Sequence, residues 1–203
     1  YGKDGQTGAV YVFRTTDDWD MYDEYKLLAS AAAGDRFGVS VAIDGDTIVV
    51  GAHDEDNERG AVDVFRSSDG GATYHEVAKL TASDAAADDE FGISVAIYKD
   101  VIVVGTYHAE SAYVYRTTDG WNTHTEIKLT ASDGAAERRF GRSVAIDGDK
   151  IVVGAFEDGY EGSAYVFRTT GGWDDSNPAY TETKRTATDA AEDDRFGWSV
   201  AVD

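Results

Sequence analysis

One block of sequence recurs along this chain and constrains its fold more than any other feature. The block from Phe37 to Gly51 reads FGVSVAIDGDTIVVG, and it returns at 91–105 as FGISVAIYKDVIVVG and at 140–154 as FGRSVAIDGDKIVVG. Residues 196–203, FGWSVAVD, begin a further copy. A repeat of about fifty residues built from short apolar runs is typical of stacked units that cannot bury their apolar faces alone. We therefore expect an array of similar units.

Each unit predicts four short β-strands. In the first full unit they cover residues 40–43, 47–52, 61–66 and 74–80, where β-branched and aromatic residues gather between turn residues. The run Ile48-Val49-Val50 is apolar on consecutive positions, which predicts a strand covered on both faces. Repeated sheets must cover one another and leave few open edges. We therefore expect an all-β fold, a β-propeller of four-stranded antiparallel blades.

The repeat also predicts the domain organisation, a single propeller region over residues 1–203. Residues 1–30 are interpreted as the second half of a blade, and residues 196–203 as the first strand of a further blade. Complete blades are expected at 37–84, 91–133 and 140–189. Two arrangements remain open: a segment of a larger propeller, or a small closed ring whose split blade joins the two ends.

The charge balance bears on partners. The chain holds 39 acidic and 18 basic residues, a formal net charge of -21, and no cysteine. This balance argues against nucleic acid, because phosphate contacts need clustered Lys and Arg. It favours a basic or cation-bridged partner, or else a solvated surface that keeps a β-rich protein from associating. No apolar run is long enough to span a membrane.

The best candidate for a metal site is the connection between the second and third strands of the first full unit. Carboxylates alternate there at Asp54, Asp56 and Glu58, in partial likeness to the opening of a calcium loop. The corresponding connection of the next unit shortens and lacks such a set. Calcium is therefore a possible cofactor, and an ordinary solvated acidic loop is the alternative.

Tryptophans mark the turn between the third and fourth strands. Trp19, Trp121 and Trp173 each follow the arginine that ends a third strand, whereas Gly71 occupies this place in the remaining unit. Large rings in turns contact either a neighbouring element or a partner. Two interpretations stay open: packing over the outer hairpin, or contact with a protein or glycan ligand.

Motifs for catalysis are missing from the sequence. There is no nucleophile elbow, no His-Glu-x-x-His and no phosphate-binding glycine loop. His53 and His108 occupy neighbouring loop positions of successive units and are expected to converge at one rim of the ring. Because a catalytic site normally breaks a repeat, we expect no catalytic residues and no enzyme activity.

Three recurring blocks resemble a known family. Phe-Gly-x-Ser-Val-Ala-Ile, Ile-Val-Val-Gly and the third-strand block that ends in arginine occur in this order three times, which resembles the FG-GAP repeat of integrin alpha chains. The resemblance implies a propeller at the cell surface or outside the cell that serves adhesion or ligand binding. Part of the pattern differs, because His53, Tyr107 and Phe156 stand where the family often has proline. The family's calcium loop between the first and second strands is not carried over, since Asp44-Gly45-Asp46 offers too few oxygens.

Together these observations predict a non-enzymatic extracellular or cell-surface binding or adhesion module that presents loops on a rigid scaffold. Its partner would be a protein or glycan. Two alternatives remain: a structural component of a larger surface assembly or filament, and the accessory propeller of a secreted hydrolase.

Overall fold

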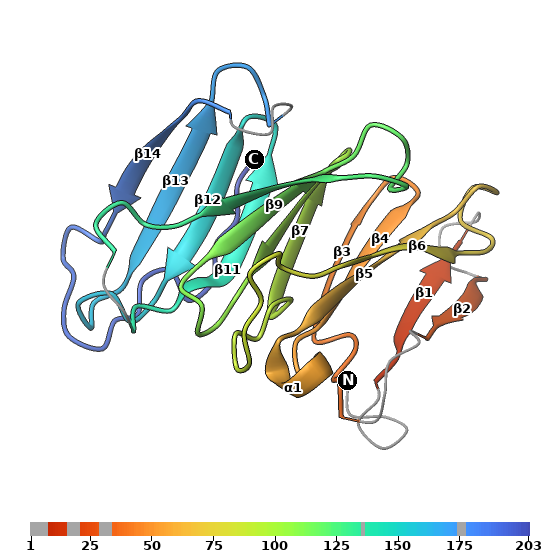
Figure 1. The fold of residues 1–203 in the computed structure, drawn as a ribbon, viewed down its shortest axis with the longest axis horizontal. Coiled ribbons are helices and arrows are strands. Elements are labelled where there is room, and N and C mark those ends of the chain that lie inside the picture. The colour runs from red at the N-terminus through yellow and green to blue at the C-terminus, as the bar shows by residue number, and fades with distance from the viewer. Residues whose placement is uncertain (1–7, 16–20, 29–33, 135–136, 174–177) are drawn as a thin grey trace.

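The structure, a computed structural model, describes residues 8–15, 21–28, 34–134, 137–173 and 178–203 and is built from antiparallel sheets (Figure 1). The first sheet has two strands, β1 (Val10–Arg14) and β2 (Asp23–Leu27). The second contains β3 (Ser40–Asp44), β4 (Thr47–Ala52), β5 (Ala61–Arg66) and β6 (His75–Leu80). The third contains β7 (Ser94–Tyr98), β8 (Val101–Gly105), β9 (Ala112–Arg116) and β10 (Thr125–Leu129). The fourth contains β11 (Phe140–Asp147), β12 (Lys150–Ala155), β13 (Ser163–Thr169) and β14 (Tyr180–Arg185).

Within each sheet the strands pair in chain order, as an antiparallel meander. The first two strands of each four-stranded sheet are joined by a two-residue turn, as Asp44 pairs with Thr47 in the second sheet. The first turn residue has positive φ in every copy: +54° at Gly45, +53° at Lys99 and +56° at Gly148. The short α1 (Glu55–Glu58), between β4 and β5, is the one helix among the described residues. No helix there has the length and hydropathy of a membrane span.

The all-β prediction is confirmed, and the sheets are arranged like blades of a propeller that does not close on itself. Strands expected at 47–52 and 61–66 coincide with β4 and β5. At 196–203, where the first strand of a further blade is expected, Phe196 forms a bridge to Gly162, and residues 197–203 form no strand with the other described residues.

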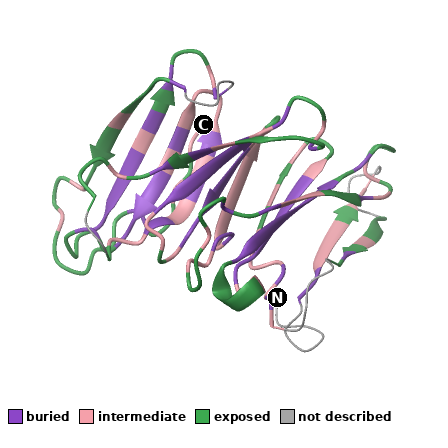
Figure 2. Ribbon diagram, viewed as in Figure 1, coloured by how far each residue is buried: buried purple, intermediate pink, exposed green. Residues whose placement is uncertain are grey.

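Apolar cores lie between sheets rather than within any one of them. One cluster joins Val49, Val62 and Val64 of the second sheet to Ile102 and Val104 of the third. Other clusters join the first sheet to the second and the third to the fourth. Buried residues accordingly follow the middle strands of each sheet (Figure 2). Each unit thus obtains from its neighbour the burial that its own single sheet cannot provide.

Adjacent sheets also meet through backbone, at the repeated glycines. A Cβ added to Gly51 at the end of β4 would lie 2.0 Å from the carbonyl oxygen of Gly92, which belongs to the next Phe-Gly pair. The same carbonyl accepts a hydrogen bond of 2.7 Å from the hydroxyl of Ser40. Only glycine permits this approach. The arrangement recurs with Gly105, Ser94 and Gly141, and with Gly154, Ser143 and Gly197.

Replacing one junction glycine should therefore separate two sheets. A Cβ at Gly105 would lie 1.8 Å from the carbonyl oxygen of Gly141, so Gly105→Ala is expected to lower the free energy of unfolding by about 3 kcal/mol. Gly171→Ala is the matched control, because a Cβ there meets no atom within 4 Å. Its effect should stay within about 1 kcal/mol in urea or thermal unfolding. Equal effects of the two substitutions would contradict the junction.

The turn between the third and fourth strands is closed by a hydroxyl and a carboxylate. In the third sheet, the hydroxyl of Thr117 accepts from the Trp121 amide at 2.9 Å, and Asp119 accepts from both the amide and the hydroxyl of Thr123, at 2.9 and 2.8 Å. These bonds to Thr123 favour the charged carboxylate and lower the pKa of Asp119. Ser67, Asp69 and Thr73 make the same bonds in the second sheet.

The corresponding turn of the fourth sheet lacks the carboxylate. Gly171 occupies the place of Asp119, and the buried hydroxyl of Thr169 has no hydrogen-bond partner in the described part of the chain. A buried hydroxyl without a partner lowers stability, since it loses its bonds to water on folding.

Restoring the carboxylate should stabilise the protein. Gly171→Asp is expected to raise the free energy of unfolding by roughly 0.5–1.5 kcal/mol at neutral pH. Because bonded aspartates of this turn have a lowered pKa, the gain should be complete above the pKa of an unfolded aspartate and disappear as pH falls through the folded one. Gly171→Asn, which does not titrate, should keep its effect in acid. Thermal melts across the acid range would reveal a gain, and no gain at neutral pH would refute the assignment.

Candidate binding site on the loop rim

One rim of the structure is formed by the connections between second and third strands together with the linkers between sheets. Backbone hydrogen bonds tie the two kinds of segment together. Glu90 in the β6–β7 linker donates its amide to the Glu58 carbonyl of the β4–β5 connection at 2.7 Å, and Phe196 donates to the Glu161 carbonyl at 2.8 Å. The rim is therefore held by the scaffold, and side chains on it have defined positions.

A charged residue with left-handed backbone precedes each Phe-Gly pair on this rim. The φ angles are +54° at Arg36, +53° at Glu90, +58° at Arg139 and +54° at Arg195. Residues with a Cβ adopt this region at a cost of about 1–2 kcal/mol, so surrounding contacts must hold them there. The equal backbone in every copy places the four side chains at equivalent points of successive units.

These side chains join a chain of charges that crosses the sheet boundaries. Asp54 lies 2.7 Å from Arg36 and 2.9 Å from His53, with His53 buried beneath it. Glu90 lies 3.9 Å from His53 and 3.6 Å from the more exposed His108. The expected convergence of the two histidines is confirmed, and one carboxylate from the intervening linker joins them.

Burial determines the protonation of the charged side chains in this row. Loss of water lowers the pKa of His53, although Asp54 partly opposes the shift. Burial likewise raises the pKa of Glu90, against the attraction of His108. His53 is therefore held mainly in its neutral form at neutral pH. A neutral imidazole between two carboxylates and Arg36 serves as a hydrogen-bonding spacer rather than as a second cation.

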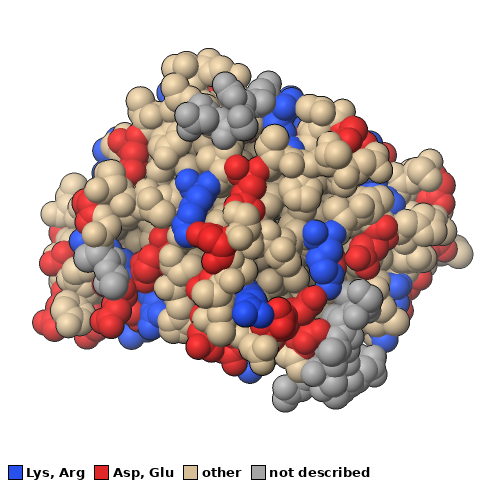
Figure 3. All heavy atoms as spheres, in the orientation of Figure 1, with Lys and Arg blue, Asp and Glu red and all other residues tan. Residues whose placement is uncertain are grey.

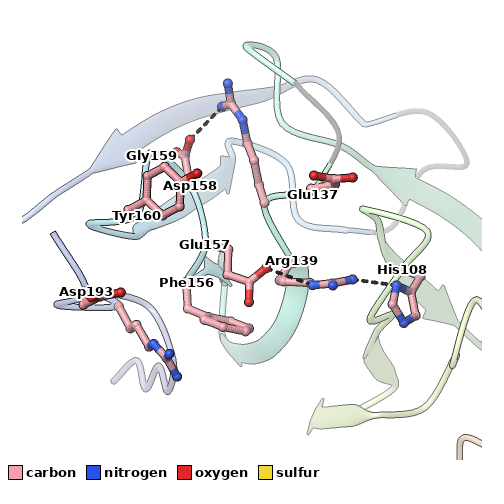
Figure 4. A pocket seen from close by; sticks show the side chains of 11 residues that line it. His108, Glu137, Arg139, Phe156, Glu157, Asp158, Gly159, Tyr160 and Asp193 are labelled. Carbon is pink, nitrogen blue, oxygen red and sulfur yellow. Dashed lines mark hydrogen bonds and ion pairs between the residues drawn. The ribbon is translucent and has the colours of Figure 1, made fainter.

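A hollow of about 910 Å³ opens beside this chain of charges (Figure 4). Arg139 crosses its floor, with its guanidinium 3.1 Å from Glu157 and 2.5 Å from the ring of His108. The wall opposite His108 is formed by the β12–β13 connection and by the linker after β14. There Tyr160 is 73% exposed, which makes it a large aromatic side chain available at the mouth.

The two connections that border the hollow differ in length. The connection from β8 to β9 is shorter than the one from β12 to β13, which carries Phe156 and Tyr160. Asp158 fixes the longer connection: it lies 3.1 Å from Arg138 and 2.5 Å from Lys184. Although burial opposes ionisation, the hydrogen bond from Lys184 and the other hydrogen bonds that Asp158 accepts lower the pKa of Asp158. The wall of the hollow is thus a charge-anchored loop.

The predicted metal ligands are not brought together. Asp54 faces Arg36 and His53, and Asp56 lies 2.9 Å from Arg59. Positive φ at Asp56 and Glu58 turns the connection back on itself, and the Glu58 carbonyl binds the linker. Among the described residues, no group of three His, Cys, Asp or Glu side chains is placed to hold a metal ion. Two of the three alternating carboxylates therefore form ion pairs, Asp56 within the loop and Asp54 with the linker before the first Phe-Gly pair.

Two of the three predicted partner-binding tryptophans lie in the cores. Trp121 is 3% exposed and belongs to the core between the second and third sheets, and Trp173 is 1% exposed in the next core. Trp19 lies outside the described residues. Burial favours packing over ligand contact for the two described rings, because a ring with no accessible face cannot touch a partner.

Sequence reasoning missed the residues of the hollow. Arg139 lies in the linker before the third Phe-Gly pair and Tyr160 in the β12–β13 connection, two segments for which the sequence predicted no site. Two signals could have indicated them: a charged residue before every Phe-Gly pair, and the unequal lengths of neighbouring connections. Neither signal shows which side chains face a common space.

Comparison with solved structures finds a similar arrangement in the crystal structure of Saccharomyces cerevisiae Sqt1, at 10% identity and a TM-score of 0.48. The match covers 76% of this chain and 36% of that chain, so the present chain spans about a third of it. No curated protein matches the sequence. The FG-GAP repeat matches at residues 22–65, 74–115 and 123–167, which span three successive units and more than half of the chain. This chain belongs to the FG-GAP repeat family.

Proposed function

We propose that the chain is a non-enzymatic binding module that works outside the cell or at its surface and holds a protein or glycan at the loop rim. The observation that carries the proposal is the hollow with Tyr160 at its mouth and Arg139 across its floor. FG-GAP repeats are found in extracellular adhesion-type propellers, which supports such a role. Recognition by loops on a rigid scaffold requires only that the loops be fixed, as the ion pairs of Asp158 fix this one.

The chemistry of the hollow suits binding better than catalysis. Four of its charged groups are engaged with one another: Arg139 with Glu157, and Arg138 with Asp158. A nucleophile with an aligned base would leave a reactive atom directed at open space. An exposed tyrosine beside paired charges instead offers a stacking surface with polar groups at its edge, which fits a sugar ring or a side chain of a protein.

Charge indicates the kind of partner. The formal net charge is -21, and acidic side chains are spread over the face in Figure 3 with basic ones between them. A basic ligand, or one engaged through a divalent cation, would be attracted over a long range.

Removing the ring at the mouth of the hollow should weaken binding. On an array of glycans and extracellular proteins, Tyr160→Ala is expected to reduce affinity for the bound ligand by roughly tenfold or more, since buried aromatic anchors dominate interfaces. Tyr22→Ala is the matched control, because Tyr22 is 60% exposed on the first sheet, away from the hollow. Equal affinities of wild type and Tyr160→Ala would exclude this part of the rim as the binding site.

Salt should weaken the complex. Titration at rising sodium chloride is expected to show falling affinity, since ions screen charges beyond about 10 Å at 0.1 M. Adding a chelator at constant ionic strength separates the two kinds of partner: it abolishes binding of a cation-bridged ligand and leaves a basic ligand bound. An affinity that is the same at low and high salt would contradict the electrostatic part of the proposal.

A further inference from the structure

One position of the third strands breaks the repeat. Tyr113 of β9 and Tyr165 of β13 occupy this position in the third and fourth sheets, and each hydroxyl donates to an aspartate of the preceding linker. A lysine of the next strand lies over each ring, with Lys128 5.3 Å from the ring centre of Tyr113. In the second sheet, Asp63 of β5 stands in place of the tyrosine. A carboxyl group thus replaces an aromatic ring inside a core.

Asp63 is buried, and apolar residues flank it along β4 and β5. The residue is 0% exposed, and neither carboxylate oxygen has a hydrogen-bond partner in the described part of the protein. Buried Ala61 and Phe65 flank it on the same face of β5, and buried Val50 lies opposite on β4. Burial raises the pKa of Asp63 to about 6, against the attraction of Lys79. The group therefore holds a proton at a much higher pH than an ordinary aspartate.

An amine and a second carboxylate converge on this carboxyl group. Lys79 of β6 is directly opposite Asp63 in the antiparallel register, and its Nζ lies 3.5 Å from Oδ1 of Asp63. The same Nζ donates to both oxygens of Glu55, at 2.6 and 2.8 Å. Glu55 belongs to α1, so three different elements bring the groups together. The equivalent lysines, Lys128 and Lys184, face a tyrosine on the neighbouring strand and pair instead with aspartates outside that strand.

We propose that Asp63 and Lys79 join in an intramolecular isopeptide bond, with Glu55 as the group that moves the protons. The amine already lies beside the carboxyl group, with Nζ 3.5 Å from Oδ1 of Asp63, and attack requires Nζ to approach Cγ to about 3–3.5 Å. Positioned in this way, the pair reacts as one molecule, and burial of the Asp63 carboxyl group favours its neutral form, which the amine can attack.

The step balances without an oxidant or a cofactor. The Lys79 ammonium gives one proton to Glu55, and the neutral Nζ attacks Cγ of the protonated Asp63. A nitrogen–carbon bond forms, and the bond from Cγ to the hydroxyl oxygen breaks. The second amine proton passes through Glu55 to the leaving hydroxyl, and one water departs. The product is an amide between β5 and β6, with Glu55 protonated.

The protonation of the Lys79 amine limits the rate at which the isopeptide bond forms. Glu55, by a hydrogen bond, and Asp63, by its charge, raise the pKa of Lys79 despite the opposing effect of burial. The amine is therefore mostly protonated at neutral pH, and attack must wait for transfer to Glu55. We expect slow conversion after folding rather than a rapid reaction.

Intact mass of the folded, purified chain tests the proposal. After prolonged incubation of the wild type, the mass should fall by that of one water. A branched tryptic peptide, in which residues 60–66 are joined through Lys79, should locate the link by fragmentation. An unchanged mass would overturn the proposal and leave a simple ion pair. A lost water that maps to an Asp-Gly step, as a succinimide, would overturn it too.

Variants separate the three roles. Asp63→Ala and Lys79→Arg should each keep the full mass, since one reacting group is missing. Glu55→Gln keeps a polar contact to Lys79 but cannot accept its proton, so it should also keep the full mass although folded by circular dichroism. Lys128→Arg, at the equivalent position of the third sheet, is the matched control and should still lose one water. A water lost equally by Glu55→Gln and wild type would refute the role of Glu55.

Discussion

The burial of apolar side chains between neighbouring sheets depends on a close contact in which one partner is a glycine, which has no side chain. The junction glycine of each second strand lies against the carbonyl of the next Phe-Gly pair, and a serine hydroxyl binds the same oxygen. This close approach brings neighbouring sheets near enough for the valines of one to pack on the isoleucine and valine of the next. Without it, each sheet would expose one apolar face, because a single four-stranded sheet has no second layer of its own.

The same junction explains why the rim is well defined. Since the Phe-Gly pair is fixed against the preceding unit, the residue just before it is fixed as well, and it takes left-handed backbone in each copy. Linkers and strand connections then meet through backbone hydrogen bonds. Connections of different length line the rim, and the hollow beside Arg139 lies next to the longer β12–β13 connection. Variation at the rim therefore leaves the cores unchanged.

The sequence predicted the strands well because their signal is local. Runs such as Ile48-Val49-Val50 and the Asp44-Gly45-Asp46 turn determine both strand and register. The convergence of His53 and His108 followed from their neighbouring loop positions in successive units. Ligand sites were harder: the alternating carboxylates at Asp54 and Asp56 indicated calcium, but each faces a basic partner, which only side-chain geometry reveals. Asp63 resembled an ordinary strand residue until its burial beside Lys79 and Glu55 was known.

The left-handed residues before each Phe-Gly pair have a consequence for how such rims diversify. Glycine would fit this backbone with less strain, yet Arg36, Glu90, Arg139 and Arg195 all carry long charged side chains there. The scaffold thus tolerates the cost of left-handed backbone at these four residues, and each unit presents a long side chain at the same point. The charge and the length of that side chain can change from unit to unit while the backbone conformation stays the same. Related proteins with the same scaffold can therefore carry different sets of charged side chains at these positions.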